Sequence, residues 1–163
     1  MIRFAHLDKS HKDIWLPRLF ELLYSNMKAI APFDSTYDEA AKDWISEVSP
    51  ALEKEPRQIL LCLQADALIG YLQYYIRGDL LMIEELQIKS EYQRTLLFCS
   101  FCKQISRILP PQVFFVEAYA QTGNLYSQRI MTRLGMECTA TPDGAYFHFC
   151  GELKEMMRTM HLS

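Results

Sequence analysis

The stretch Leu80–Leu109, LLMIEELQIKSEYQRTLLFCSFCKQISRIL, decides how the rest of the chain is arranged. Its first part is apolar and predicts a strand over residues 80–88. After the polar turn SEYQR, the apolar positions recur at helical spacing and predict a helix of about fourteen residues that stops before Pro110-Pro111. The unpaired N–H groups and the dipole at the start of such a helix favour an anionic ligand. The stretch therefore predicts an anion site where a strand passes into a helix.

This turn resembles the acyl-CoA loop of the GNAT superfamily of N-acyltransferases, whose pattern is Gln/Arg-x-x-Gly-x-Gly/Ala. Gln93 occupies the first position of the pattern, and Leu96 and Phe98 occupy the two positions where the family has small residues. The absence of glycine leaves two alternatives open. Either the side chains at 96 and 98 turn away and leave the N–H groups free, or Phe98 fills the space of the pyrophosphate.

A second stretch, Asn124–Met136, resembles the later helix of the same family, commonly Asn-x-x-Ala-x-x-x-Tyr-x-x-x-Gly-Phe. Asn124, Ser127 and Gly135 stand at the matching positions, and Met131 stands where the family commonly has Tyr. The two motifs lie in the family's order. The resemblance implies an α/β (α+β) fold with a mixed, mostly antiparallel central sheet flanked by helices.

The predicted elements have the same order as in that family. Apolar spacing predicts a helix from Asp13 to Ala31, stopped by Pro32. The pair Ser35-Thr36 with Glu39 has capping-box spacing, and the helix that follows ends at Pro50 or in the stretch LEKEP. The remaining segments are predicted as strands over 2–4, 58–64, 67–77, 80–88 and 112–119, a helix over 124–134 with Gly135 as its C-cap, and a hairpin of 136–140 with 145–153. Gly70 inside its strand indicates a bulge or a close approach of the backbone. We expect one domain over 1–153 and a C-terminal tail over 154–163.

The composition excludes several classes of protein. The net charge of −3 and the lack of a run of Lys and Arg argue against nucleic acid as a partner. No window approaches the ~18 continuous apolar residues of a membrane span, and the start of the sequence lacks the apolar core of a signal peptide. We expect a cytoplasmic protein, a monomer or homodimer, without a membrane partner.

The five cysteines do not form the pattern of a disulfide scaffold. Cys99 and Cys102 make a CxxC, but they lie inside the predicted helix and no second pair follows. A redox protein would need Cys99 exposed with a lowered pKa, and a zinc site would need four ligands at compatible spacing. We interpret all five cysteines as small apolar residues and expect no metal site.

The resemblance to the GNAT superfamily implies acetyl-CoA as co-substrate. The residues that it places at the coenzyme, including the backbone N–H groups at the end of the 80–88 strand, are Leu86, Gln87, Ile88, Gln93, Arg94, Thr95, Leu96, Leu97, Phe98, Asn124 and Ser127. It also places the region between the two N-terminal helices over the acceptor substrate. Phe33, Tyr37 and Trp44 are therefore candidates for the acceptor pocket, with simple packing of the helix pair as the alternative.

Direct acyl transfer to an amine needs a group that takes up a proton from the acceptor. Carboxylates in apolar strands suit this role, because burial raises their pKa. We favour Glu84, with Glu117 as second choice; Glu84 and Glu85 point to opposite faces of their strand. Met131 cannot protonate a leaving thiolate. Ser127, one turn earlier on roughly the same face, is a candidate replacement through a bridging water, and Tyr119 and Tyr146 are the alternatives.

The sequence thus predicts an acyl-CoA-dependent N-acetyltransferase of the GNAT type, which transfers an acetyl group directly to a primary amine of a small molecule or peptide. The alternative is a catalytically degenerate GNAT-like module that binds a ligand or a protein. The turn from Gln93 to Cys99 separates the two hypotheses: free amides favour the enzyme, and a groove filled by Phe98 favours the binding module.

Overall fold

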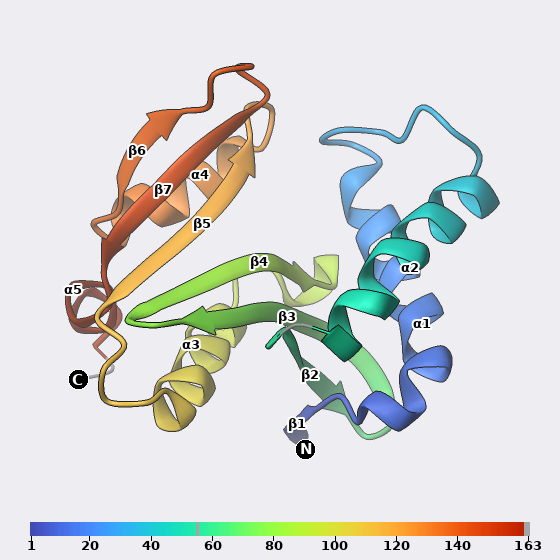
Figure 1. The fold of residues 1–163 in the computed structure, drawn as a ribbon, viewed down its shortest axis with the longest axis horizontal. Coiled ribbons are helices and arrows are strands. Elements are labelled where there is room, and N and C mark those ends of the chain that lie inside the picture. Colours follow the sequence, from blue (N-terminus) through green and yellow to red (C-terminus); the bar gives the residue numbers. More distant parts are fainter. Residues whose placement is uncertain (55, 162–163) are drawn as a thin grey trace. The chain divides into compact units, whose positions relative to one another are not determined.

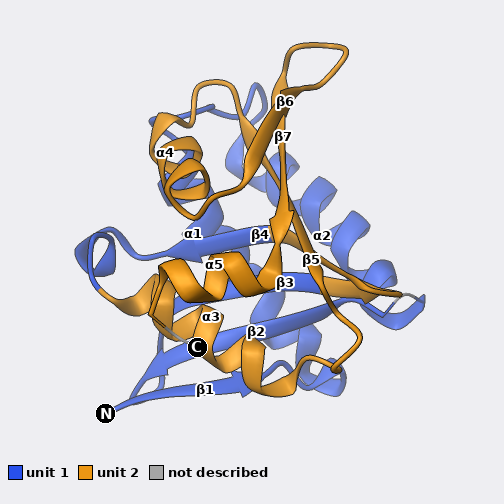
Figure 2. Cartoon of the chain, turned by 90° about the vertical axis from the view of Figure 1, so that its left-hand side faces the viewer, with its two compact units in different colours: residues 1–74, 85–95 blue, residues 75–84, 96–163 orange. Residues whose placement is uncertain are grey.

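The computed structural model describes residues 1–54 and 56–161, and its chain forms two compact units (Figures 1 and 2). Unit 1 comprises residues 1–74 and 85–95, and unit 2 comprises residues 75–84 and 96 onward. Glu55, in the stretch expected to end the second helix, and Leu162 and Ser163, in the expected tail, lie outside the described residues. The division into one domain over 1–153 and a tail stays a prediction.

The elements follow in the order expected from the sequence. They are β1 (Ile2–His6), α1 (Lys12–Met27), α2 (Tyr37–Lys54), β2 (Gln58–Gln64), β3 (Ala67–Arg77), β4 (Leu80–Ile88), α3 (Leu97–Ile108), β5 (Phe115–Gln121), α4 (Leu125–Arg133), β6 (Glu137–Ala140), β7 (Tyr146–Glu152) and α5 (Leu153–Thr159), with short 3-10 turns at Lys9–His11 and Ser90–Tyr92. The strand order in the sheet is β1-β2-β3-β4-β5-β7-β6. The pairs β1–β2, β2–β3, β5–β7 and β6–β7 are antiparallel and the pair β4–β5 is parallel, which confirms the predicted mixed, mostly antiparallel sheet. In the parts of the chain with coordinates described, no helix combines the length and the apolar character needed to cross a bilayer.

Unit 1 is built on the antiparallel strands β1, β2 and β3. The register between β2 and β3 shifts by one residue, because Cys62 pairs with Gly70 while Leu63 pairs with Leu68. Ile69 is the extra residue, and the predicted bulge beside Gly70 is confirmed. The carbonyl of Ile69 accepts the N–H of Lys89 at 2.9 Å, so this carbonyl fixes the point where β4 ends.

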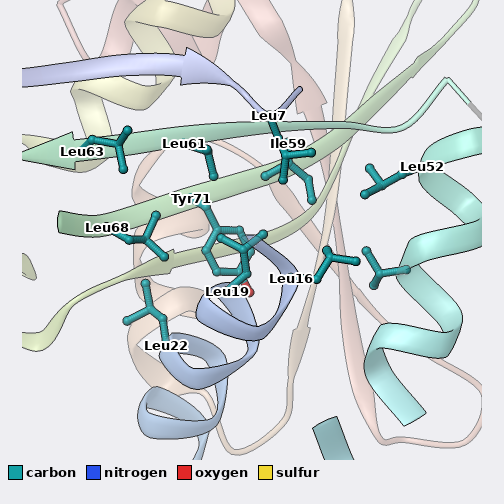
Figure 3. Close-up of a cluster of buried hydrophobic side chains, with 11 residues drawn as sticks. Leu7, Leu16, Leu19, Leu22, Leu52, Ile59, Leu61, Leu63, Leu68 and Tyr71 are labelled. Carbon is teal, nitrogen blue, oxygen red and sulfur yellow. The ribbon is translucent and has the colours of Figure 1, made fainter. Parts of the chain in front are cut away.

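The main core of unit 1 lies between one face of these strands and helices α1 and α2 (Figure 3). Burial of apolar side chains supplies most of the stabilisation of such a core. Its fully or nearly fully buried members come from both helices, the strands and the segment after β1: Leu7, Leu16, Leu19, Leu22, Val48, Leu52, Ile59, Leu61, Leu63, Leu68 and Tyr71. The Tyr71 hydroxyl donates a hydrogen bond to Glu85, so the one polar atom of this ring is satisfied.

Helix α2 begins with the predicted capping box. The Glu39 carboxylate accepts the N–H of Thr36 at 3.0 Å, and the Thr36 hydroxyl faces the N–H of Glu39 at 3.4 Å. The helix continues through Pro50 and ends at Lys54, so the stretch LEKEP rather than Pro50 stops it. Its Ala40, Val48 and Leu52 are buried.

Unit 2 contains the first part of β4, then α3, β5, α4, β6, β7 and α5. In α3 the buried residues are Leu97, Phe101, Cys102 and Ile105, which is the helical spacing predicted from the sequence. Helix α4 ends at Arg133, and Gly135, directly after the C-cap residue Leu134, has a φ of +80° in the left-handed region that favours glycine, as expected for the glycine that terminates a helix. The last helix, α5, buries Met156 and Met157.

Several predicted boundaries were wrong. Helix α1 ends at Met27 instead of Ala31, and Lys28, Ala29 and Ile30 after it are exposed. Helix α3 starts at Leu97, after a 3-10 turn, and is two residues shorter than expected. Strand β5 starts at Phe115 rather than residue 112, because the preceding residues form a turn in which Val113 donates to Pro110. Ile14, expected on the apolar side of α1, is exposed.

The five cysteines, predicted to act as small apolar residues, differ in exposure: Cys62 and Cys102 are buried, and Cys138 is exposed on β6. Burial raises the pKa of the Cys62 thiol to about 11 and that of Cys102 to about 12. The reactive species is the thiolate. At pH 8 in the folded protein we therefore expect Ellman's reagent to react first with Cys138 and not at Cys62 or Cys102 until denaturant is added. Cys138→Ser should remove the fast phase; an unchanged fast phase would contradict this assignment.

Candidate active site

The end of strand β4 and the turn after it are tied to helix α1 within unit 1. The side-chain amide of Asn26 on α1 donates to the Gln87 side chain at 2.9 Å and to the Ile88 carbonyl at 3.0 Å. The Gln93 side chain donates to the same carbonyl at 3.0 Å. Because Gln87 is buried, its polar side chain needs such a partner. The three side chains fix the backbone where the resemblance places the reacting thioester.

Asn26 was not found by sequence reasoning. It lies 62 residues from Ile88 in the chain, and no local pattern links the two positions. Gln93 was expected at the coenzyme. Its side chain holds the turn to β4 through the hydrogen bond to the Ile88 carbonyl, and a contact of this residue with a coenzyme stays a prediction.

The turn from Gln93 to Phe98 leaves the start of α3 without a side-chain cap. Leu96 is the N-cap residue; its side chain makes no capping hydrogen bond and is 78% exposed. The side chain of Leu97, the first residue of α3, is buried. The Thr95 N–H donates to the Tyr92 carbonyl at 3.4 Å, and the Ser100 N–H donates to the Leu96 carbonyl at 2.9 Å. Among the described residues no acceptor is recorded for the N–H groups of Phe98 and Cys99. Such groups, together with the helix dipole, suit an anion.

Three other features of this turn bear on an anion. Arg94 is exposed and has a φ of +65°, a left-handed conformation that a non-glycine residue adopts at a cost. Thr95 uses its hydroxyl to bond the Tyr92 carbonyl at 2.6 Å. Phe98 is half-buried, so its ring is neither fully in the core nor fully in solvent. The turn keeps its backbone shape without glycine.

Helix α4, by contrast, has a filled N-terminus. The Asn124 side chain accepts the N–H of Ser127 at 3.1 Å, which is the role of an N-cap residue. Ser127 and Met131 are half-buried on this helix, and Tyr126 is exposed. Of the two helix N-termini that the motifs brought forward, that of α4 has a side-chain cap and that of α3 has none.

The three aromatic residues expected at the acceptor pocket surround the Phe20 ring. The ring centroids of Phe33, Tyr37 and Trp44 lie 5.6, 5.4 and 5.8 Å from that of Phe20. Phe20 is completely buried, and Phe33 and Trp44 are half-buried around it, which is the geometry of core packing. Tyr37 is partly exposed, and its pKa is raised by burial, with smaller contributions from nearby carboxylates and Tyr24.

The candidate carboxylates lie in different settings. Glu84 is half-buried in β4. Glu85, next in the strand, accepts the hydrogen bond of the buried Tyr71; desolvation, and then the charge of Glu85, raises the pKa of that tyrosine well above its usual value. Glu117 in β5 lies beside His148 in β7, with 3.2 Å between the carboxylate oxygen and Nε2. A role for His148 was not predicted, because only the pairing of β5 with β7 brings it to Glu117.

No metal site is assembled in residues 1–54 and 56–161, where no group of three or more His, Cys, Asp and Glu is placed to hold an ion. Burial raises the thiol pKa of Cys102, which is opposite to the shift that a redox-active CxxC requires. The CxxC therefore belongs to the packing of α3.

No family model and no curated protein matches the sequence. Solved structures match the fold over nearly the whole chain. An acetyltransferase of the GNAT family from Desulfovibrio desulfuricans has a TM-score of 0.66 at 12% identity over 94% of this chain and 99% of its own. The PaiA N-acetyltransferase of Thermoplasma acidophilum, in complex with coenzyme A, has a TM-score of 0.71 at 15% identity, covering 93% and 99%. The aminoglycoside acetyltransferase AAC(6')-Ib, with coenzyme A and kanamycin, has a TM-score of 0.65 at 18% identity, covering 98% and 99%. The chain has the fold of the GNAT acetyltransferases.

Proposed function

We propose that this protein is an N-acetyltransferase that transfers an acetyl group from acetyl-CoA to a primary amine by direct transfer. The observation that carries the proposal is the uncapped start of α3, which follows β4 after the 3-10 turn Ser90–Tyr92, in a fold with solved examples bound to coenzyme A. When bound, acetyl-CoA supplies a thioester carbonyl that an amine can attack. The protein's own residues must then hold phosphate, fix the carbonyl, and accept a proton.

For the coenzyme we propose the residues around the two motifs. The N–H groups of Phe98 and Cys99, with the Arg94 guanidinium, hold the pyrophosphate. The backbone of Leu86, Gln87 and Ile88, fixed by Asn26, orients the thioester. Further contacts are assigned to Thr95, Leu96, Leu97, Asn124 and Ser127, with Gln93 acting by holding the turn.

For the chemistry we propose that a carboxylate on the acceptor side promotes loss of a proton from the amine. Glu117 is favoured here, because it lies beside a histidine, and Glu84 is the alternative. Met131 has no proton to give, so Ser127 serves the leaving group through a water. A thiol such as that of cysteine has an unperturbed pKa of about 8.5, and its thiolate leaves without full protonation, so a missing acid lowers the rate without abolishing it.

The test is a thermal-shift titration with acetyl-CoA and coenzyme A, combined with Leu96→Asp. At a hundred times its dissociation constant a ligand stabilises the folded state by about 2.7 kcal/mol, or roughly 5–10 °C for this chain length. The new carboxylate interacts favourably with the positive end of the α3 helix dipole and repels phosphate. We expect Leu96→Asp to keep or slightly raise the melting temperature without ligand and to weaken coenzyme binding by about tenfold or more.

The matched control is Ile14→Asp, which places the same charge in the first turn of α1 at another exposed apolar residue. It should leave coenzyme binding unchanged. Equal affinity of Leu96→Asp and the unaltered protein would contradict the proposed phosphate site. If neither ligand changes the melting temperature of the unaltered, folded protein, the alternative is favoured, a GNAT-like module without catalysis. The half-buried Phe98, at a position where the family has a small residue, supports this alternative.

A further inference from the structure

The peptide group between Ile88 and Lys89, at the end of β4, uses all of its hydrogen-bonding capacity inside unit 1. Its N–H, which belongs to Lys89, donates to the Ile69 carbonyl on β3 at 2.9 Å. Its carbonyl, which belongs to Ile88, points the opposite way, because a trans peptide places the two groups on opposite sides. There it accepts the side-chain amides of Asn26 and Gln93, each at 3.0 Å. A carbonyl oxygen has two lone pairs, so this one is closed to a further donor.

The orientation of the Asn26 amide follows from its two neighbours. Its NH₂ group donates to the Gln87 side chain at 2.9 Å and to the Ile88 carbonyl. Since a backbone carbonyl only accepts, the nitrogen of Asn26 and not its oxygen faces Ile88. Both hydrogens of the NH₂ group are thereby used. Asn26 is half-buried in the last turn of α1, so the carbonyl is held from a packed helix, whereas Gln93 is exposed and holds it from the turn.

The closed carbonyl lies beside backbone groups that face away from β3, the neighbour of β4 in the sheet (Figure 1). Successive residues of a strand direct their backbone groups to alternate sides, so Leu86 and Ile88 share this side. In the described part of the chain β4 pairs with β5 over Leu80–Ile83, and both residues lie beyond that pairing. With the Ile88 carbonyl closed, this side offers two N–H donors and one acceptor, the Leu86 carbonyl. It therefore suits a ligand oxygen better than a ligand N–H.

An open carbonyl at Ile88 would repel such an oxygen. The oxygen of a peptide carries partial negative charge, and water screens the repulsion between two oxygens less in a partly buried place than in solution. Ile88 is half-buried and Gln87 is buried. The amide hydrogens of Asn26 and Gln93 offset the negative charge of the carbonyl. They also fix the direction of the peptide, so the neighbouring Ile88 N–H is oriented before a ligand binds.

We infer that Asn26 and Gln93 are positioning residues for the acyl group. By closing the Ile88 carbonyl they leave the N–H groups of Leu86 and Ile88 to bind the thioester oxygen, which gives the protein its preference for acetyl-CoA over coenzyme A. The inference rests on the proposed function. Coenzyme A ends in a thiol and lacks this oxygen, so the contact is lost when the acetyl group has been transferred, and the product binds more weakly than the substrate.

The first experiment compares the dissociation constants of acetyl-CoA and coenzyme A by titration calorimetry. The unaltered protein should bind acetyl-CoA about 3–10-fold more tightly, which corresponds to one hydrogen bond. Asn26→Leu should reduce this preference to less than about twofold and change the affinity for coenzyme A by less than about twofold. Gln93→Leu should act in the same direction and less strongly, because Asn26 still fills one lone pair. A merely structural role would weaken the binding of both ligands equally.

The matched control is Tyr92→Phe. The Tyr92 hydroxyl donates to the Gln64 side chain and so holds the same turn to the end of β2 without touching the Ile88 carbonyl. Its loss should leave the preference for acetyl-CoA unchanged. A reduced preference in this control, equal to that in Asn26→Leu, would assign the effect to the turn as a whole and overturn the role of the closed carbonyl.

The second experiment observes the peptide itself. The dipeptide Ile-Lys occurs once in the sequence, so labelling with ¹³C-carbonyl isoleucine and ¹⁵N-lysine gives a single HNCO peak, that of Ile88 and Lys89. Loss of a hydrogen bond moves a carbonyl carbon upfield. Asn26→Leu and Gln93→Leu should therefore each move this peak upfield, and Tyr92→Phe should not. Coenzyme A should leave the carbonyl shift of the unaltered protein in place, because both amides stay on the oxygen.

The outcomes separate the inference from the proposed function. If neither ligand binds the unaltered protein, the proposed function and the inference are both overturned. If both ligands bind, and Asn26→Leu and Gln93→Leu keep the preference for acetyl-CoA or weaken both ligands equally, the inference alone is overturned. An upfield move of the carbonyl on addition of coenzyme A would show that the ligand displaces an amide, and overturns it too. Gln93→Leu alters an exposed side chain, so the test stands even where Asn26→Leu does not fold.

Discussion

Phe20→Ala should destabilise the protein by about 3–5 kcal/mol, because it removes a completely buried ring and leaves a cavity. The ring is the centre of an aromatic cluster, with the centroids of Tyr24, Phe33, Tyr37 and Trp44 all within 5.8 Å. These neighbours come from α1, α2 and the segment between them, so collapse around the cavity would have to move several elements. At this chain length the melting temperature should fall by roughly 10 °C or more.

Urea denaturation followed by tryptophan fluorescence measures this loss, since Trp44 touches the altered site. Ile14→Ala is the matched control on the same helix, where an exposed apolar side chain is shortened, and should change the free energy of unfolding by less than about 0.5 kcal/mol. A loss below about 1 kcal/mol for Phe20→Ala would show that the aromatic cluster is not the packed centre of the two helices.

Phe149→Ala, in unit 2, should lower the free energy of unfolding by a similar ~3–5 kcal/mol. Phe149 lies in β7 between Ala118 and Cys138 on the neighbouring strands and is almost fully buried. Both tryptophans, Trp15 and Trp44, belong to unit 1, so their fluorescence does not report on β7 directly. We nevertheless expect the fluorescence transition to move with the circular-dichroism transition, because strands β3 and β4 each supply residues to both units.

Tyr126→Ala, at an exposed residue of α4, is the control for loss of an aromatic ring in unit 2 and should leave both transitions in place. Two separate transitions in Phe149→Ala, with the fluorescence midpoint unchanged, would mean that unit 1 stays folded when unit 2 opens.

The sequence predicted the elements better than the contacts between them. The strands over 58–64, 67–77 and 80–88 have the bounds expected from their apolar runs and turns, and Thr36, Glu39 and Gly135 act as the predicted caps. These signals are local, since each depends on residues a few positions apart. The sequence also identified the turn at 93–98 as a candidate site, through its resemblance to a coenzyme-binding loop.

The contacts that shape the candidate site are long-range and had no local signal. Asn26 reaches Ile88 because α1 packs on the strands of unit 1, and His148 reaches Glu117 because β5 and β7 pair in one register. A shift of that register by one residue would turn His148 to the other face. Gln93 was assigned to the coenzyme from its motif position, while its side chain bonds the Ile88 carbonyl.

Because of the bulge at Ile69, the number of residues in β3 determines the pairing of β3 with β2 on both sides of the bulge. Before the bulge Leu68 pairs with Leu63, and after it Gly70 pairs with Cys62, so the extra residue absorbs one position of the ladder. Its carbonyl also receives Lys89 at the end of β4. A substitution at Ile69 keeps the number of residues in β3. Deletion of Ile69 would remove the carbonyl that accepts the Lys89 N–H and shift the register of β3 against β2. Natural insertions and deletions among homologues should therefore collect in the Ala65-Asp66 turn and spare β3.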